Sequence, residues 1–412
     1  MSRVLIVSYL FPPFNGPGTQ HPTWFYRYLR EYGFETVALT SSVYFGTPDM
    51  SSALSQDPCV VQLPRGRNAR RLTYQLYHAE LWAQLRFEAW EPGFAWGGMF
   101  GVPAAVQLLK RERFAAMISV SPTVSSHWTA LRLKRRFPDL KWIADFQDPF
   151  VGNPFKKENL VKRLESRLEH DIFSTADCLS ANTDTARDLW QQRYPQYVNK
   201  MGVTWGGFDP EETVNALPIP PGEPPVMKHV GSLYDGRHPT ALLHSLKRQV
   251  AQGRLRPGDL VVEFVGALKF GTLAPLVADL ESKGFLRLRP TYVSRPEALG
   301  IAASAHYSLL LDIAPQNGAL QVPAKLFDQI RIGRPILAFT PSGSPTERIL
   351  ADSGIPYVSL APDAPGEEVD AGILRLLQMP PTPKNASTRF LDTFSARRLA
   401  GLMAARIRGE QV

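Results

Sequence analysis

Short apolar segments alternate with longer helical segments along this chain, and the alternation occurs once in each half. Such alternation is typical of α/β proteins with parallel sheets, because a helix must carry the chain back to the starting end of each new strand. Predicted strands lie at 4–9, 36–40, 60–63, 115–120, 142–146 and 178–181, then at 226–230, 261–265, 286–291, 307–311, 336–339 and 357–360. Predicted helices of the first half lie at 22–32, 102–111, 126–136, 160–174 and 183–194.

The two halves join at 206–225, GGFDPEETVNALPIPPGEPP, where Gly and Pro concentrate as they do in linkers. A chain of 412 residues is also too long for a single core. We therefore predict two doubly wound α/β domains that face each other across a cleft. The first is 1–205, to which a C-terminal helix at 390–412 crosses back, and the second is 206–389.

Four basic clusters lie in the first half of a chain whose net charge is +8, at 65–71, 110–113, 132–136 and 156–163. These clusters fit nucleic acid, an anionic membrane surface that carries a lipid-linked acceptor, or an ordinary solvated surface. Nucleic acid is the least favoured of the three, because no zinc finger, RNP aromatic pair or basic zipper accompanies the charge.

The two cysteines, Cys59 and Cys178, are too few for a disulfide framework or a zinc site. We expect both thiols to be small core residues of a cytoplasmic protein. The apolar run at the start, MSRVLIVSYLF, is too short to span a membrane and lacks a signal-peptide cleavage pattern. No segment approaches about 18 uninterrupted apolar residues, so no membrane-spanning helix is expected.

The block 322–341, VPAKLFDQIRIGRPILAFTP, holds an acid and a base at the start of a predicted helix. Lys325 and Asp328 are about one turn apart and lie on the same side. Gly333 ends that helix before the apolar strand ILAF. An acid and a base in this position suit a ligand with hydroxyls and phosphates, while the alternative is a surface ion pair in an ordinary αβ unit.

Two further loops of the second half combine glycine with a cation. Gly231 and Ser232 follow the strand VMKHV and precede Arg237, and Lys269 follows the glycine loop after VVEFV. Glycine lets the backbone pass close to a pyrophosphate, and Arg pairs with phosphate through two parallel hydrogen bonds. Together with Lys325, these loops predict a diphosphate site beside a ribose site.

The first loop of the chain, FPPFNGPGTQH, also lies between a strand and a helix. Its residues Gly16, Pro17 and Gly18 allow a close backbone approach to a ligand, and the next helix offers free N–H groups. The spacing is not G-x-G-x-x-G, so a nicotinamide cofactor is excluded. A plain surface loop is the alternative.

Three titratable residues of the first half follow strands. Asp145 and Asp148 belong to the segment DFQDP, which ends the predicted fifth strand, and His127 lies near the start of the helix after SVSPTVSS. Side chains at the carboxyl ends of parallel strands face a ligand site in open α/β sheets. Caps, turns and a structural histidine are the alternatives.

Several common catalytic patterns are absent from the sequence. There is no His/Cys/Glu cluster with metal spacing, no G-x-S-x-G elbow, no Walker A loop and no H-E-x-x-H. We therefore expect neither a metal nor a cofactor, and hydrolase, NTPase and zinc-enzyme interpretations lose support.

In their order along the chain, these motifs resemble the bacterial family 4 (GT4-like) glycosyltransferases of the GT-B fold, over nearly its whole length. The first segments to match are LIVSYLFPPFNGPGTQHPTWFYRYLREYGFETVALT, SVSPTVSSHWTALRL and WIADFQDPF, and the later ones are HVGSLYDGRHP and VPAKLFDQIRIGRPILAF. The resemblance implies two Rossmann-like domains and a hexosyltransferase-type enzyme of cell-surface polysaccharide or glycoconjugate biosynthesis. Its partners would be a nucleotide-sugar donor and a hydroxyl acceptor, which could be a glycan, a lipid-linked molecule or a small molecule.

The resemblance also implies roles for individual residues. The catalytic contacts near the sugar would come from His127, Asp145 and Asp148, and the acceptor loop from Gly16, Pro17 and Gly18. The donor diphosphate would bind Gly231, Ser232, Arg237, Lys269 and Lys325, and the ribose would bind Asp328. Transfer would retain the anomeric configuration, with leaving-group phosphate helping to deprotonate the acceptor.

Two positions depart from the family pattern. Leu320 stands where many members carry the first of two glutamates, and Gln147 stands where an Arg is common. Three alternatives therefore stay open: an inverting transferase, a nucleotide-sugar epimerase, and a catalytically silent GT-B protein that binds a nucleotide or a partner. Inversion would require a base, for which Asp145, Asp148 and His127 are the options.

Overall fold

The computed structural model of the chain describes residues 2–14, 16–43, 48, 52–87, 91–151, 160–220, 222–233, 237–312 and 320–410. The chain divides into two compact units, Met1–Pro210 with Phe394–Val412, and Glu211–Thr393. The division expected from the sequence was 1–205 with 390–412, and 206–389.

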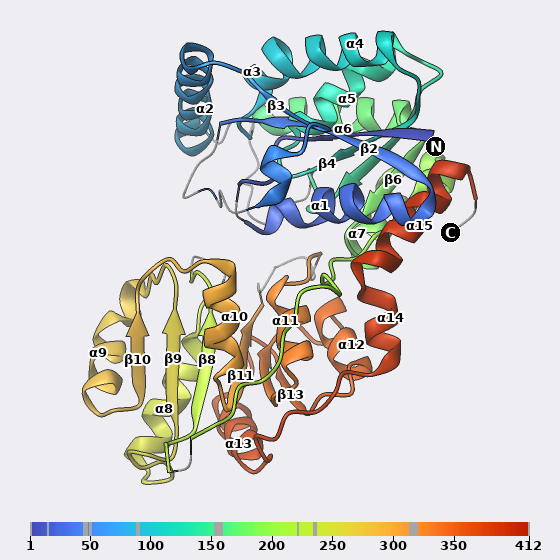
Figure 1. The fold of residues 1–412 in the computed structure, drawn as a ribbon. Helices are drawn as coiled ribbons and strands as arrows, with labels where there is room; N and C mark the ends of the chain where they lie inside the picture. The colour runs from blue at the N-terminus through green and yellow to red at the C-terminus, as the bar shows by residue number, and fades with distance from the viewer. Residues whose placement is uncertain are drawn as a thin grey trace. The chain divides into compact units, whose positions relative to one another are not determined.

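The first unit is built on a parallel sheet of seven strands in the order β3-β2-β1-β4-β5-β6-β7 (Figure 1). The strands are β1 Ser2–Ser8, β2 Phe34–Ser41, β3 Val60–Leu63, β4 Phe114–Val120, β5 Lys141–Phe146, β6 Cys178–Ala181 and β7 Met201–Val203. The helices are α1 Gln20–Tyr28, α2 Arg67–Phe87, α3 Phe94–Trp96, α4 Val102–Arg111, α5 Ser125–Arg136, α6 Leu160–Thr175, α7 Asp184–Arg193 and α15 Ala396–Arg408. Short 3-10 or π turns lie at Pro17–Thr19, Leu29–Tyr32, Ala53–Gln56, Gly97–Gly101 and Pro195–Lys200.

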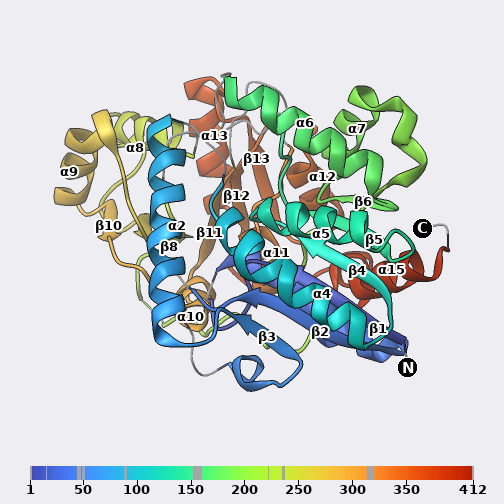
Figure 2. The same cartoon turned by 90° about the horizontal axis from the view of Figure 1, so that it is seen from above.

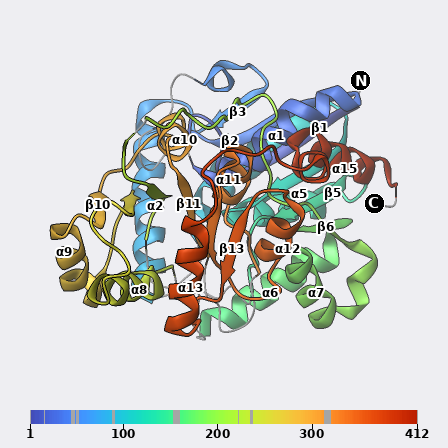
Figure 3. The same ribbon diagram turned by 90° about the horizontal axis from the view of Figure 1, so that it is seen from below.

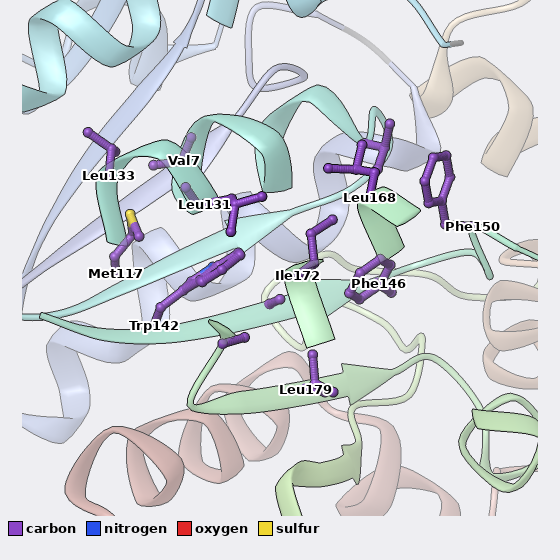
Figure 4. Close-up of a cluster of buried hydrophobic side chains, with 14 of the residues drawn as sticks. Val7, Met117, Leu131, Leu133, Trp142, Phe146, Phe150, Leu168, Ile172 and Leu179 are labelled. Carbon is purple, nitrogen blue, oxygen red and sulfur yellow. The ribbon is translucent and has the colours of Figure 1, made fainter. Parts of the chain in front are cut away.

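The central strands of this sheet are apolar on both faces, as parallel strands covered on both sides must be. Val4, Leu5, Ile6 and Val7 of β1 are all fully buried. One face carries the cluster drawn in Figure 4, which includes Trp142 and Phe146 of β5 and residues of α5 and α6. Its residues labelled there are Val7, Met117, Leu131, Leu133, Trp142, Phe146, Phe150, Leu168, Ile172 and Leu179.

The C-terminal helix α15 belongs to the first unit, where it packs beside α1 (Figure 1). Leu399 and Met403 are buried against the other face of the sheet. Arg406 is also buried, and its guanidinium donates to the Ser180 hydroxyl at 3.0 Å and to the Val203 carbonyl at 2.8 Å. The end of the chain is thus fastened to the edge of the first sheet by apolar packing and by one buried cation.

The second unit is built on a parallel sheet of six strands in the order β10-β9-β8-β11-β12-β13, whose two edges can be followed in Figure 3. The strands are β8 Val226–Val230, β9 Val261–Val265, β10 Leu286–Arg289, β11 Tyr307–Leu311, β12 Ile336–Phe339 and β13 Tyr357–Leu360. The helices are α8 Thr240–Ala251, α9 Ala274–Ser282, α10 Arg295–Ala303, α11 Lys325–Ile332, α12 Pro345–Asp352, α13 Gly366–Leu377 and α14 Thr388–Phe394, with a 3-10 turn at Gly271–Leu273.

The predicted α/β class with parallel sheets is confirmed, since every pairing within the two sheets is parallel. Strand β7 and helix α2 were not predicted. The expectation for Cys59 was wrong, because this residue precedes β3 on the surface and is exposed. Cys178 is partly buried in β6. Among the described residues, no helix is long and apolar enough to cross a bilayer.

Candidate functional site

The second sheet reverses its strand order between β8 and β11, because β8 is the first strand of this unit and later strands are added on both sides of it. Ligands of open α/β sheets bind at the carboxyl ends of the strands at such a switch point. The β8–β11 ladder is short, with register pairs at Met227–Tyr307 and Lys228–Ser308. Beyond these pairs, backbone groups of β11 can form hydrogen bonds with side chains instead of with β8.

Side chains of β8 and α11 meet where this ladder ends. The Leu309 carbonyl accepts from Nδ1 of His229 at 3.1 Å and from Nε2 of Gln329 at 3.2 Å. Because Nδ1 of His229 carries this hydrogen, Nε2 of the neutral ring accepts from Nζ of Lys325, 3.1 Å away. Burial, and then the Lys325 charge, lower the pKa of His229 well below its usual value. A neutral His229 therefore fixes the position of the Lys325 amine.

The backbone beside that amine is glycine, and a side chain there would collide with it. A Cβ on Gly231 would lie 2.4 Å from Nζ of Lys325, and φ at Gly231 is +138°. Gly266, at φ +135°, lies against the loop that follows β8. A Cβ added to Gly266 would lie 2.7 Å from the Gly231 carbonyl oxygen. The loops after β8 and β9 are also joined by a hydrogen bond from the Gly231 amide to the Val265 carbonyl, at 2.8 Å.

The charge of Lys325 is poorly balanced inside the protein. Burial, and then the nearby Arg237 charge, lower the pKa of Lys325 well below its usual range. Arg237 also lowers the pKa of His229, so it lies close to both residues. No acidic group within the described ranges contributes to the pKa shift of Lys325. An anionic ligand here would stabilise both cations.

The other residues predicted for the diphosphate lie farther out on the same loops. Ser232 is exposed after β8, and Lys269 is exposed after β9. The structure thus brings Gly231, Arg237 and Lys325 together, while the contribution of Ser232 and Lys269 stays a prediction.

Asp328 lies one turn beyond Lys325 on α11 and is nearly buried. Its two carboxylate oxygens accept from Nη1 and Nη2 of Arg295 at 3.2 and 3.1 Å, and Arg295 also pairs with Glu212 at 2.6 Å. Burial raises the pKa of Asp328, and Arg295 opposes that shift. The ribose role of Asp328 stays a prediction, to which the structure adds Arg295 and Glu212 as the groups that hold this carboxylate.

In the first unit, Asp145 is paired inside the protein. Its Oδ2 lies 2.8 Å from Nδ1 of His21 in α1, and both side chains are buried. His21 is enclosed by the rings of Trp24 and Phe25, at centroid distances of 5.6 Å each. Asp145 thus ties β5 to α1, and His21 is a partner that sequence reasoning missed.

His127 lies on α5, and its side chain is fully buried against β4 and β5. Its contact with a substrate stays a prediction. Nδ1 of His127 lies 2.8 Å from the Ser119 hydroxyl, and the His127 ring lies 4.0 Å from that of Phe146. Burial lowers the pKa of His127 to about 3, so the ring is neutral at physiological pH. His127 is a core histidine in this structure.

The first loop lies against the loops that follow β4 and β5. A Cβ on Gly18 would lie 2.9 Å from Leu10 and 3.0 Å from Pro122, and Nε2 of Gln147 donates to the Gly18 carbonyl at 3.4 Å. Gly18 is therefore explained by close packing.

The remaining predicted residues of the first unit lie at the same end of the sheet. Gly16 accepts from the Thr19 amide at 3.0 Å, and Pro17 opens the 3-10 turn that follows. Asp148 is partly exposed on the turn after β5. The acceptor roles of Gly16, Pro17, Gly18 and Asp148 stay predictions.

Comparison with known sequences gives no match, either to a protein-family model or to a curated protein. Comparison of folds gives many. An α,α-trehalose-phosphate synthase (UDP-forming) from Burkholderia vietnamiensis superposes with a TM-score of 0.62 at 12% identity, covering 99% of this chain and 100% of the other.

Two further solved structures are similar over their whole length. WaaG, a glycosyltransferase involved in lipopolysaccharide biosynthesis, gives a TM-score of 0.56 at 12% identity, covering 99% of this chain and 100% of the other. HepE of Anabaena in complex with UDP and glucose gives 0.56 at 12%, covering 98% and 95%. The chain therefore has the GT-B fold, with two Rossmann-like domains.

Proposed function

We propose that this chain transfers a sugar from a nucleotide-diphosphate sugar to a hydroxyl group of an acceptor. The observation that carries the proposal is the amine of Lys325, held by His229 beside Gly231 at the switch point of the second sheet. A diphosphate would meet there a positioned cation, a second cation from Arg237 and a backbone that approaches closely.

The same groups supply chemistry for the transfer. When the bond between sugar and diphosphate breaks, negative charge accumulates on the leaving diphosphate. Lys325 is positioned before the reaction by its bond to His229, so it stabilises that charge at little reorganisation cost. This use of preorganised charge needs no metal, and we propose a metal-independent transfer.

The choice of donor is guided by what similar folds hold. HepE of Anabaena was solved with UDP and glucose, and the similar trehalose-phosphate synthase is a UDP-forming enzyme. We therefore propose UDP-hexose as the first donor to test and GDP-, dTDP- and ADP-sugars as alternatives.

For the stereochemistry we propose retention. An inverting transfer needs a base that reaches the acceptor hydroxyl. Asp145 is engaged by His21 inside the first unit, and His127 is fully buried, which speaks against a base from either residue. Asp148, which is partly exposed, is the remaining option for a base. The anomeric configuration of the first-formed product, measured by NMR, decides between retention and inversion.

The acceptor and the cellular setting are proposals of the same kind. A glycan, a lipid-linked molecule or a small molecule with a free hydroxyl would fit, and the setting would be cell-surface polysaccharide or glycoconjugate biosynthesis at the cytoplasmic face of a membrane. A screen of hydroxyl acceptors with radiolabelled donor separates these classes.

A thermal-shift screen with UDP, GDP, dTDP and ADP tests the donor site. A nucleotide at 100 times its Kd adds about 2.7 kcal/mol of stability, and for a domain of 150–250 residues each kcal/mol raises Tm by roughly 2–4 °C. We expect one nucleotide to stabilise the wild type and to raise the Tm of Lys325→Met by less. If none stabilises it at millimolar concentration, the donor site is refuted. If one binds but no donor sugar is ever released or transferred, the chain is a catalytically silent binding protein.

A further inference from the structure

Arg295, in the first turn of α10, binds two carboxylates at once. Its Nη1 and Nη2 donate to the Asp328 carboxylate at 3.2 and 3.1 Å. Its Nε and Nη2 donate to the Glu212 carboxylate at 3.0 and 2.6 Å. A planar guanidinium forms such paired bonds with a defined geometry. The bonds to Glu212 are the shorter ones, so the orientation in which Arg295 meets Asp328 depends on Glu212.

Glu212 lies in the segment 211–217, which opens the second unit and is here called the opening segment. This segment forms neither helix nor strand and packs on α10 and α11. Helix α10 itself packs against β8 and α11 (Figures 1 and 2). Val214 is buried in a small apolar cluster with these helices, and the Leu217 amide donates to the Ala303 carbonyl at 2.9 Å. Glu212 thus connects the opening segment to Arg295.

Asp328 keeps acceptor capacity beside Arg295. Each carboxylate oxygen offers two lone pairs, and Arg295 uses one on each oxygen. The side chain of Asp328 is 13% exposed. Two neighbouring hydroxyls, such as those of a ribose, can therefore donate to the remaining lone pairs. Because hydrogen bonds weaken steeply when they are misaligned, the orientation of this carboxylate decides how well it meets both hydroxyls.

We propose that Arg295 couples the nucleotide site to the opening segment. A ribose binds Asp328 most tightly when the segment is packed in place and Glu212 orients Arg295. By thermodynamic linkage, the bound nucleotide stabilises the packed segment by the same factor. Glu212 and Arg295 are thus positioning residues, which act on the nucleotide through Asp328. The inference rests on the proposed nucleotide-sugar site.

A purely structural role for Arg295 makes a different prediction. An ion-paired group that only stabilises the fold would not respond to a nucleotide. The distinction needs a ligand that binds the cations of the site and does not reach Asp328. Inorganic pyrophosphate is such a ligand, because it offers phosphates to Lys325 and has no ribose.

Hydrogen exchange of the wild-type protein is the first test, because it needs no variant. Amide exchange in the opening segment is measured by mass spectrometry without ligand, with saturating nucleotide (UDP first, then GDP, dTDP and ADP) and with saturating pyrophosphate. We expect the nucleotide to slow this exchange by about fivefold or more, and pyrophosphate to leave it unchanged. Equal slowing by both ligands, or no slowing by a bound nucleotide, overturns the proposal.

Nucleotide affinities of variants, measured by calorimetry, are the second test. Glu212→Gln removes the charge and one acceptor from Arg295, and it should raise the nucleotide Kd by about fivefold or more while the pyrophosphate Kd stays within about twofold. In an Asp328→Asn background, the same substitution should change the nucleotide Kd by less than about twofold, because the coupling through Asp328 is already lost. Arg295→Lys keeps the charge without the paired geometry, so it should weaken nucleotide binding as Glu212→Gln does.

Glu297→Gln is the matched control. Glu297 also lies in the first turn of α10 and pairs with an arginine, Arg289. We expect this variant to bind the nucleotide as the wild type does, and circular dichroism checks that every variant is folded. If Glu212→Gln keeps the wild-type Kd, or if Glu297→Gln loses as much affinity, the coupling is refuted and the nucleotide site stands. If no nucleotide binds the wild type, the proposed function fails and the coupling fails with it.

Discussion

The two switch points of this molecule have the same topology and use their polar residues differently. In the first unit, the β1–β4 ladder continues through six register pairs, as far as Ser8–Val120. In the second, the β8–β11 ladder stops after two pairs. Beside the long ladder, His21 and Asp145 pair with each other. Beside the short ladder, Lys325 contacts a neutral histidine and glycine backbone.

The comparison distinguishes polar residues that stabilise the fold from polar residues that can bind a ligand. A buried carboxylate with an internal partner stabilises the contact between its elements. A buried amine without an acid destabilises the empty protein and gains from an anion. Burial alone does not identify a site; the balance of charge around the buried group does.

The largest expected effect lies in the first unit. Asp145→Ala leaves His21 without its partner, and breaking a buried pair in this way costs about 3–5 kcal/mol. We expect the loss in the free energy of unfolding of this unit, seen as faster amide hydrogen exchange in β5 and β6 and unchanged exchange in β9. Asp145→Asn keeps an oxygen acceptor for His21 and should lose less.

The nucleotide affinity of a folded Asp145→Ala protein should stay within about twofold of the wild type. A large loss of nucleotide affinity in a folded Asp145→Ala protein would show that the first unit also holds the donor, and the contrast between the two units would fail.

The second effect should appear in nucleotide binding. Lys325→Met removes a charged hydrogen bond to phosphate, which is worth about 1.5–3 kcal/mol, or roughly 10–150-fold in Kd. Gly231→Ala should cost at least as much, because the added Cβ meets Nζ of Lys325 and the backbone lies at positive φ. Isothermal titration calorimetry measures both. Lys247→Met, on the exposed side of α8, is the matched control, and a loss equal to that of Lys325→Met would refute the site.

The third effect is a pair of pH dependences in different ranges. His127 has a pKa of about 3 when folded and about 6.5 when unfolded, so the unfolded chain binds the extra proton between these values. Stability should therefore fall as pH falls from 6.5 toward 3, by up to about 1.4 kcal/mol per pH unit. Urea unfolding of His127→Gln should show a weaker slope than the wild type over this range.

Lys325 should act between its lowered folded pKa and 10.5. Its folded pKa is lowered below 10.5, so between the two values the unfolded chain again binds more protons, and stability rises with pH. Bound diphosphate favours the protonated amine, so nucleotide affinity should fall over the same range. Lys325→Met should remove both slopes. A wild-type affinity that does not change with pH would contradict the assignment.

The fold was predictable because its strands are apolar runs bounded by glycine and proline, as in VVEFV before Gly266. Helix α2 was missed because its exposed face carries Tyr74, Trp82 and Leu85, so the apolar residues do not mark a single buried side. Within the site, Gly231 and Lys325 were predicted because glycine and a cation next to strand ends are local signals.

Other parts of the site depend on distant partners. His229 was read only as part of a buried strand, and its bond to Lys325 joins residues 96 positions apart. The Arg295–Glu212 pair spans 83 positions. The sequence places His127 at the start of a helix beside the end of a strand, where its side chain can be either exposed or buried. Its packing against Phe146, which the sequence does not show, decides that it is buried.

The smallest expected effect contrasts two ion pairs of similar geometry. Nη1 of Arg27 lies 3.1 Å from Asp209 in the first unit, and its side chain is 43% exposed. Solvent screens such a pair, so Arg27→Ala should cost no more than about 1 kcal/mol. Arg295→Ala should cost several times more, because Arg295 makes two hydrogen bonds to Asp328 and two to Glu212, and its loss leaves these carboxylates without the cation they share. Urea unfolding of the two variants measures the difference, and equal losses would mean that the second carboxylate held by Arg295 adds no stability.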